Sequence, residues 1–434
     1  MPIGVLAGIV FSILFAFILV GLPVAYCLGV TGLAGLIFAE GSKAWVVLTG
    51  GAALHHLASF GLLAIPLFIL MSSYITESGM GPKLIDFTTK WFSRFPGYLH
   101  SAAIAACGVF SAMCGSSMAT AATIGGVVLP EIKRRGHDMN MGLGAVAAGG
   151  TLGILIPPSN QFILYGVLTE TSVARLFIAG IVPGILMVIC FIAYTSLRSV
   201  RNPIIAPGAK DEITWGERWL ALRQIWTGLL LIASVLGGIF MGIVTPTEAA
   251  ALGGLLALLL GIFVLKKLTL ALSHQAAVKA VQITTMVGFI IMGGLILGRA
   301  ITLLDLSGEL ITIIEGSGLS RWSVMILINL VLFFLGMLMD GAAIVMITTP
   351  LIFPVVVTLG FDPIWFGVVF CINVELALIT PPVGMNLFII KGITDEKMID
   401  IIKGVFPYFL IMVGMLILVM VFPQLSLWLP TVMQ

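Results

Sequence analysis

Two pairs of short stretches in this sequence hold residues that are suited to binding ions. The tip MCGSS (113–117) precedes the interruption IPPSN (156–160), and the tip LMDGA (338–342) precedes the interruption TPPVGMN (380–386). Adjacent prolines break a helix, because they lack backbone N–H groups and clash with the preceding turn. A break leaves carbonyl and amide groups without partners, and such carbonyls suit Na⁺ whereas amide ends suit an anion. The stretches therefore predict two cation sites with an anionic substrate between them.

The composition places these stretches in a membrane. Of the 434 residues, 60% are hydrophobic and 9% are charged, and the mean hydropathy is +1.19. Soluble domains carry roughly 25% charged residues. The chain is therefore predicted to be an all-α polytopic membrane protein, and its 50 glycines and 20 prolines favour many broken helices. The net charge of +2 gives no indication of nucleic-acid binding, and the five cysteines lack the spacing of disulfides or metal ligands.

The chain repeats itself at one fixed spacing. The segment PEIKRRGHD (130–138) corresponds to PVVVTLGFD (354–362), which lies 224 residues later (354 minus 130). The same spacing relates the two double prolines, Pro157-Pro158 and Pro381-Pro382. We therefore expect two homologous halves, 1–200 and 219–434, joined by a polar linker over 201–218.

The first half is predicted to contain five spans and one hairpin. A helix over 82–95 has an apolar face and a charged face, which indicates a helix that lies in the membrane interface. Two short apolar arms on either side of MCGSS are near the lower limit for crossing a hydrocarbon core of ~30 Å, so we expect a re-entrant hairpin. The predicted elements are scaffold spans within 1–80, the interfacial helix 82–95, the hairpin 98–134, the broken helix 140–168 and the span 173–198.

The second half is predicted to repeat this order. A short polar connector is expected where the first half has its interfacial helix. The predicted elements are scaffold spans within 220–303, the hairpin 320–358, the broken helix 364–391 and the span 399–422.

The two halves are expected to be inverted in the membrane. Five crossings per half is an odd number, so the second half must start on the opposite side from the first. Cytoplasmic loops collect Lys and Arg. Lys133, Arg134 and Arg135 in the first copy have no charged counterparts in the second, so the first loop is predicted to face the cytoplasm and the second to face outward, with both termini outside.

Inverted repeats with paired hairpins and broken helices are typical of secondary transporters. The hairpin GSSMATAATIGGVVLPEIKRRG, followed by GGTLGILIPPSN, resembles the large membrane subunit of tripartite ATP-independent periplasmic (TRAP) transporters, and the resemblance covers essentially the whole chain. It implies an ion-transporter-type fold in which a transport domain moves against a scaffold as an elevator. It also implies Na⁺-driven uptake of an organic acid, of the sialic acid or C4-dicarboxylate type, across a bacterial inner membrane.

The resemblance implies partners as well. One is a small four-helix membrane subunit on a separate chain, and the other is a periplasmic substrate-binding protein. It further implies at least two Na⁺ sites and a substrate site. Asp340 stands where the first copy has Ser116, which puts a strictly symmetric second site in doubt. The first Na⁺ site implied is Cys114, Ser116, Gly153, Ile156 and Pro158; the second is Asp340, Gly341, Ala377, Thr380 and Pro382; the substrate contacts are Ser117, Thr151, Pro157, Ser159, Asn160, Gly384 and Asn386.

Several residues have simpler interpretations. Ser116 and Ser117 could cap a helix. Arg299 and Glu375, which stand in apolar runs, could serve in function or only in packing.

Other functions also remain open. A Na⁺- or H⁺-coupled carboxylate carrier without a binding protein is the main alternative. A channel is disfavoured by the two ion-like sites. An intramembrane hydrolase would need a base near the serines, and the histidines nearest in sequence, His100 and His137, stand at the hairpin ends.

Overall fold

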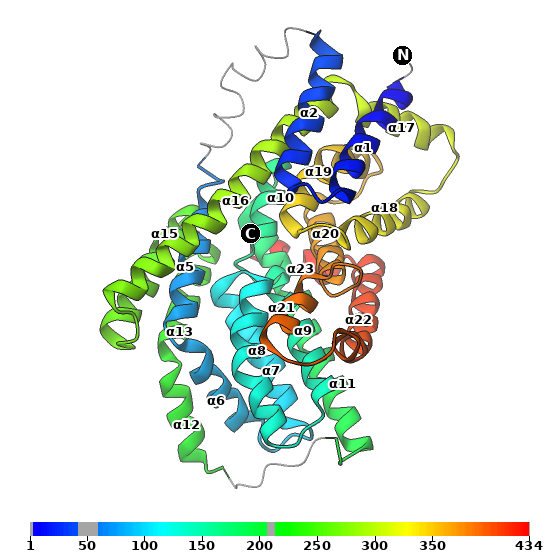
Figure 1. Cartoon of the computed structure of the whole chain (residues 1–434). Coiled ribbons are helices and arrows are strands. Elements are labelled where there is room, and N and C mark those ends of the chain that lie inside the picture. The colour runs from blue at the N-terminus through cyan, green and yellow to red at the C-terminus, as the bar shows by residue number, and fades with distance from the viewer. Residues whose placement is uncertain (1–2, 42–59, 206–212, 434) are drawn as a thin grey trace.

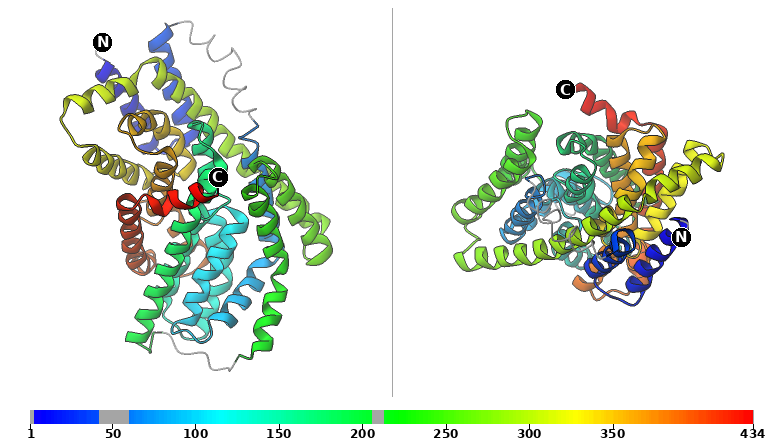
Figure 2. Two further views of the ribbon diagram at one scale, coloured as in Figure 1. Left: turned by 180° about the vertical axis from the view of Figure 1, so that it is seen from behind. Right: turned by 90° about the horizontal axis from the view of Figure 1, so that it is seen from above.

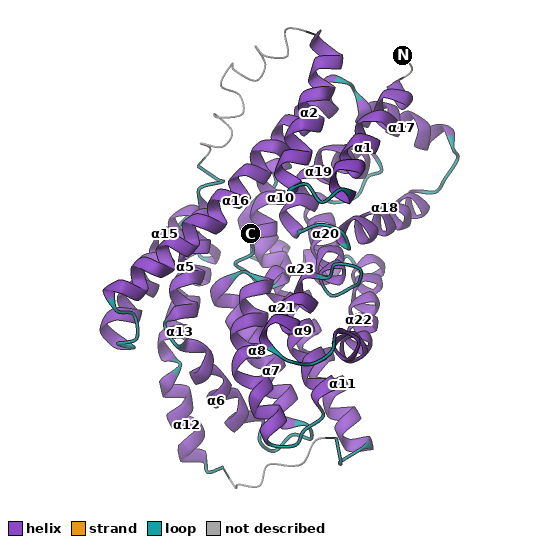
Figure 3. Ribbon diagram, in the orientation of Figure 1, coloured by secondary structure: helices purple, strands orange, loops and turns teal. Residues whose placement is uncertain are grey.

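The computed structural model of the chain describes residues 3–41, 60–205 and 213–433, and within them it is built of helices and loops alone (Figures 1 and 3). Six described helices are long and apolar enough to cross a membrane, or seven if one bent pair counts as a span. The chain is thus an all-α polytopic membrane protein, as predicted.

The helices of the first half end in a long span that leads to the linker. They are α1 (Ile3–Leu19), α2 (Val24–Glu40), α5 (Ala64–Glu77), α6 (Met80–Phe92), α7 (Tyr98–Cys114), α8 (Ser117–Arg134), α9 (Met139–Leu155), α10 (Asn160–Leu168) and α11 (Val173–Arg201). The scaffold spans predicted within 1–80 are α1, α2 and α5, and residues 42–59 of that range lie outside the described residues.

The second half contains α16, the longest of the helices that the structure describes, and two π-helical segments. Its elements are α12 (Trp215–Gln224), α13 (Trp226–Ile232), η2 (Ala233–Gly237), α14 (Gly238–Phe240), α15 (Pro246–Leu259), η3 (Leu260–Val264), α16 (Leu270–Leu303), α17 (Leu306–Gly316), α18 (Arg321–Gly336), α19 (Gly341–Thr358), α20 (Pro363–Leu378), α21 (Met385–Ile393), α22 (Met398–Val421) and α23 (Gln424–Val432).

The internal repeat is visible in the helix bounds. Helix α8 begins at Ser117 and α19 at Gly341, while α9 begins at Met139 and α20 at Pro363, so both pairs differ by 224 residues. The peptide bonds Pro157-Pro158 and Pro381-Pro382 are both cis. The sequence repeat is therefore a repeat of backbone structure as well.

The two hairpins point toward each other. Hairpin 1 (α7 and α8) and hairpin 2 (α18 and α19) both bring their tips to one cavity. From there α7 and α8 extend to one end of the elongated molecule, while α19 lies toward the other end (Figures 1 and 2). This opposed arrangement is the inverted topology expected from the odd number of spans.

Helix α16 joins the elements outside the hairpins by packing along α2 and α5. Glycines bring the backbones together: a Cβ added at Gly32 would lie 2.7 Å from the Cα of Leu297, and one at Gly293 would lie 2.6 Å from the carbonyl oxygen of Ala25. Small residues allow such approach in membranes, where van der Waals contact replaces the hydrophobic effect between helices.

The predicted polar linker and the predicted polar connector both contain helical residues. The predicted linker 201–218 includes the first residues of α12, because Thr214 and Glu217 form a capping box that starts the helix and buried Arg218 donates a hydrogen bond to the hydroxyl of Ser93. The predicted polar connector contains α17, whose apolar residues recur at helical spacing. Helix α17 stands where the first half has α6.

The remaining differences concern shape and extent. The first of the scaffold spans predicted within 220–303 is bent by 53° between α12 and α13, and a short helix that was not predicted, α23, follows α22. Helix α6, predicted at 82–95, packs against α7, α8 and α12. Its Trp91 donates a hydrogen bond of 3.3 Å to the carbonyl oxygen of Arg218.

The inverted arrangement predicts opposite labelling of equivalent residues. Arg134 and Thr358 are the last residues of α8 and α19, and both are exposed. In a background without reactive native cysteines, Arg134→Cys should react with an impermeant maleimide only from the cytoplasm and Thr358→Cys only from outside. Labelling of both from one face would contradict the inversion.

Candidate functional site

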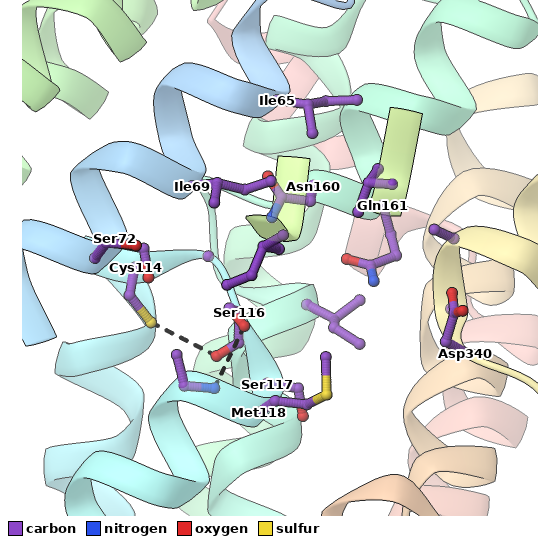
Figure 4. Close-up of a pocket in the computed structure, with 18 of the residues that line it drawn as sticks. Ile65, Ile69, Ser72, Cys114, Ser116, Ser117, Met118, Asn160, Gln161 and Asp340 are labelled. Carbon is purple, nitrogen blue, oxygen red and sulfur yellow. Dashed lines mark hydrogen bonds between the residues drawn. The ribbon is translucent and has the colours of Figure 1, made fainter. Parts of the chain in front are cut away.

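A cavity of about 390 Å³ lies where the two hairpin tips meet α5 and α16 (Figure 4). The N-termini of α8, α10 and α19 open onto it, through Ser117, Asn160 and Gly341. A helix N-terminus carries a partial positive charge that favours an anion at α8 and α10, whereas the carboxylate of Asp340 already occupies the N-terminus of α19. Apolar side chains of α5 and α16 form much of the opposite wall.

The first tip packs directly on the first helix break. Gly115, at φ +63°, lies so close that a Cβ there would collide with the carbonyl oxygen of Pro158. A Cβ added at Gly153 would lie 2.8 Å from the carbonyl oxygen of Ser116 and 2.9 Å from the nitrogen of Ser117. The structure thus brings Ser116, Gly153 and Pro158 together, although the break is about 40 residues from the tip in sequence.

The first tip is held by its own short-range hydrogen bonds. The Ser116 hydroxyl accepts from the amide of Ala119 (3.4 Å), so it caps α8, while the Ser116 carbonyl accepts from the Thr120 hydroxyl (2.9 Å). The thiol of Cys114 lies 3.1 Å from the same hydroxyl. Ile156 ends α9, and its side chain lies against Gly184.

The second tip is arranged differently. Asp340 caps α19 by accepting from the amide of Ala343 (3.0 Å), and its side chain lines the cavity. Ala377 packs against Gly336, at the end of the first arm of hairpin 2. Thr380 donates a hydrogen bond of 2.6 Å to the carbonyl oxygen of Leu376.

The two breaks differ in burial. Pro157 and Pro158 are buried, whereas Pro381 and Pro382 are exposed. The second loop is tied to its hairpin by a hydrogen bond of 3.2 Å from the amide of Val383 to the carbonyl oxygen of Met337. The second set of predicted ligands is thus more open than the first.

Asn386 joins the two halves. Its carboxamide donates to the Ser117 hydroxyl (2.7 Å) and to the carbonyl oxygen of Ala147 (3.2 Å), and both Asn386 and Ser117 are buried. A residue of the second break therefore supports the first tip. Its side-chain donors are engaged within the protein.

The predicted substrate contacts fall into two groups. Ser117 and Asn160 line the cavity. Thr151 instead bonds the carbonyl oxygen of Ala148 (2.7 Å), and Ser159 caps α10 by accepting from the amide of Phe162 (3.3 Å). The predicted residues that do not border the cavity are Thr151, Pro157, Ser159, Gly384 and Asn386.

Sequence reasoning missed Gln161, Glu77 and Lys279, which also line the cavity. Gln161 directly follows the predicted site residue Asn160 and could have been found by extending the break by one position. The Nζ of Lys279 lies 3.2 Å from the Oε1 of Glu77. The sequence gives only a weak signal for this ion pair, because Glu77 and Lys279 are 202 residues apart.

The two charged residues noted in apolar runs are placed differently. Arg299 is exposed near the C-terminal end of α16. Glu375 is fully buried in α20, and its carboxyl oxygens have no hydrogen-bond partner among the described residues.

A hydrolytic site is not supported by the geometry around the tip serines. His100 donates from Nε2 to the carbonyl oxygen of Asp138 (3.0 Å) and lies in the first turn of α7, whose other end carries the tip. Within the described ranges, the hydroxyls of Ser116 and Ser117 have hydrogen bonds to Ala119 and Asn386 and none to a histidine.

Inverted halves, opposed hairpins and a cavity between broken helices define a polytopic membrane carrier. The family model described as the tripartite ATP-independent periplasmic transporter, DctM component, matches residues 11–425. The chain belongs to this family. It is a large permease subunit of a TRAP transporter, and the family indicates solute uptake.

Named relatives cover nearly all of the chain. A C4-dicarboxylate TRAP transporter large permease protein of Rhodobacter capsulatus is 34% identical over 98% of this chain and 99% of its own length. A protein of the same name from Pseudomonas aeruginosa is 37% identical over 86% of both chains. The solved structure of the YdaH transporter of Alcanivorax borkumensis has a TM-score of 0.64 over 89% of both chains at 14% identity, so it shows similarity of fold alone.

The two asparagines near the cavity should behave differently. Asn386→Ala should lower the free energy of unfolding by about 1–3 kcal/mol, because buried Ser117 and Ala147 lose a hydrogen-bond partner. Asn160→Ala should leave stability nearly unchanged but reduce uptake, since its side-chain oxygen has no partner among the described residues. Thermal unfolding in detergent and uptake by vesicles measure the two effects. Equal losses of stability would contradict this division.

Proposed function

We propose that this chain carries a C4-dicarboxylate across the bacterial inner membrane together with Na⁺. The observation that carries the proposal is the cavity between the two hairpin tips, onto which three helix N-termini open. The names of the two relatives favour a C4-dicarboxylate over a sialic acid. The chain would act as a carrier rather than as an enzyme.

The residues around the first tip fit a Na⁺ ion. Na⁺ prefers oxygen ligands, and this region presents the carbonyl oxygen of Pro158 against Gly115 and that of Ser116 against Gly153. The Ser116 carbonyl already accepts from Thr120, so that hydrogen bond would be shared with the ion. Gly153 is needed because its lack of a side chain lets the break approach the tip.

A second Na⁺ would bind at the second tip. Asp340 supplies a carboxylate there, which Ser116 does not in the first half. Backbone oxygens near Gly341, Ala377, Thr380 and Pro382 would complete the set. The greater exposure of this break suits an ion that enters and leaves during the cycle.

We propose that transport is an elevator movement of the hairpins and broken helices. The packing that supports this is the set α2, α5, α15 and α16, in which α16 contacts both α2 and α5, and α15 contacts α5. Helices α7 to α11 and α18 to α22 would form the moving body. The cavity lies between the two sets, so movement of one against the other would carry a bound anion.

The proposed cycle requires two other proteins. A periplasmic binding protein would deliver the substrate at the outer face, and a small four-helix subunit would brace α2, α5, α15 and α16. The alternative is a carrier that takes substrate directly from solution, coupled to Na⁺ or H⁺.

Reconstitution with components left out tests this proposal. Vesicles that hold this chain and its small subunit should take up a C4-dicarboxylate only when the loaded binding protein and an inward Na⁺ gradient are both supplied. Saturable uptake by this chain alone would favour the direct carrier. Uptake of sialic acid in place of a dicarboxylate would overturn the substrate assignment.

Two glycines test the first Na⁺ site. Gly153→Ala should raise the Na⁺ concentration needed for half-maximal uptake by about tenfold or more, because the added Cβ would lie within 2.9 Å of the tip backbone. Gly126→Ala is the matched control, since a Cβ in that exposed part of α8 would meet nothing within 4 Å. The measurement is uptake against Na⁺ concentration at constant ionic strength. Unchanged Na⁺ dependence in folded Gly153→Ala would exclude this site.

A further inference from the structure

The cavity has a charged pair on the wall formed by α5 and α16. Lys279 is the only cationic side chain among the described lining residues, whereas Glu77 and Asp340 are anionic. The Nζ of Lys279 lies 3.2 Å from the Oε1 of Glu77, and the two side chains are 65% and 32% exposed. An ion pair this exposed contributes little to folding stability, because water screens it.

The hairpin side of the cavity has a different kind of positive pole. The N-termini of α8 and α10 present partial positive charges and amides, whereas the carboxylate of Asp340 offsets the charge at the N-terminus of α19. Figure 4 shows Asn160 near Ser116 at the tip of hairpin 1 and the side chain of Gln161 between that tip and Asp340. The carbonyl oxygens of both carboxamides are buried and have no partner among the described residues. A carboxamide can turn either its donor or its acceptor end toward a ligand.

A ligand with two negative ends matches two positive poles on opposite walls. One carboxylate would lie at the helix N-termini of the hairpin side. The other would reach the ammonium group of Lys279 on α16. A ligand with a single carboxylate would use one pole and leave the other paired with Glu77.

We propose that Lys279 binds the second carboxylate of a dicarboxylate substrate and that Glu77 is its counter-ion when the cavity is empty. This inference rests on the proposed function and assigns a residue for recognition of the substrate charge. Binding exchanges one carboxylate for another at the same ammonium. The Glu77 carboxylate thus competes with the substrate.

The competition predicts opposite effects for the two members of the pair. Lys279→Gln should reduce dicarboxylate uptake at subsaturating loaded binding protein by about tenfold or more, because a charge-assisted hydrogen bond to the substrate is lost. Lys279→Arg should retain most of the uptake. Glu77→Gln should increase uptake at subsaturating loaded binding protein, since Lys279 loses its competitor.

Exchanging the charges of Glu77 and Lys279 distinguishes a role in substrate recognition from a purely structural ion pair. The double variant Glu77→Lys with Lys279→Glu keeps a pair between α5 and α16 and should keep the melting temperature. Its uptake should remain as low as that of Lys279→Gln, because the positive charge now stands on α5. Restored uptake in the exchanged variant, or equal losses in the two single Gln variants, would overturn the proposal.

Chemical restoration of the charge gives a second test, in which one variant is compared with and without a positive charge at position 279. Lys279→Cys is reconstituted with the small subunit and treated with aminoethyl methanethiosulfonate, which restores an ammonium group, or with methyl methanethiosulfonate, which does not. Uptake should recover only with the ammonium reagent. Recovery with both reagents, or with neither, would contradict the role of the charge.

The proposed function and the role of Lys279 can be disproved separately. If the unmodified chain with all its partners takes up no dicarboxylate, the proposed function is wrong. If it takes up dicarboxylate and Lys279→Gln does so equally well, the proposed function stands and Lys279 is not the recognition residue.

Discussion

The need to satisfy broken backbone inside a membrane governs the rest of this structure. A helix that stops within the bilayer leaves amides and carbonyls that lipid cannot hydrogen-bond. Here the stop after α9 is covered by the tip of hairpin 1, and the contact is close because Gly115 and Gly153 have no side chains. The tip in turn is held by Asn386 of the opposite half. Each half therefore depends on the other for a stable cavity.

The repeated parts were accessible from sequence because they recur at one spacing. Two matching proline pairs, two tips and two loops located both hairpins and both broken helices within a few residues. Local chemistry also identified the tip serine that begins helix α8. A motif that occurs twice is a stronger signal than either copy alone, since chance rarely produces several matches at the same long spacing.

Other features could not be predicted because they depend on neighbours that are distant in sequence. The start of α12 is fixed locally by Thr214 and Glu217, but the burial of Arg218 depends on α6. Asn386 was expected to contact a ligand, and only the packing of α21 on α8 and α9 shows that its donors are occupied. The pairing of Glu77 with Lys279 likewise requires knowledge of how α5 meets α16. Pattern analysis gives the residue types at a site, whereas cross-repeat packing decides which of them remain free.

The unequal burial of the two double-proline loops has an energetic consequence. Pro157 and Pro158 are enclosed while Pro381 and Pro382 are exposed. The packing around the two loops therefore contributes unequally to stability, because the enclosed pair has close neighbours to lose and the exposed pair has few. The second loop can change its surroundings at a lower cost in free energy than the first.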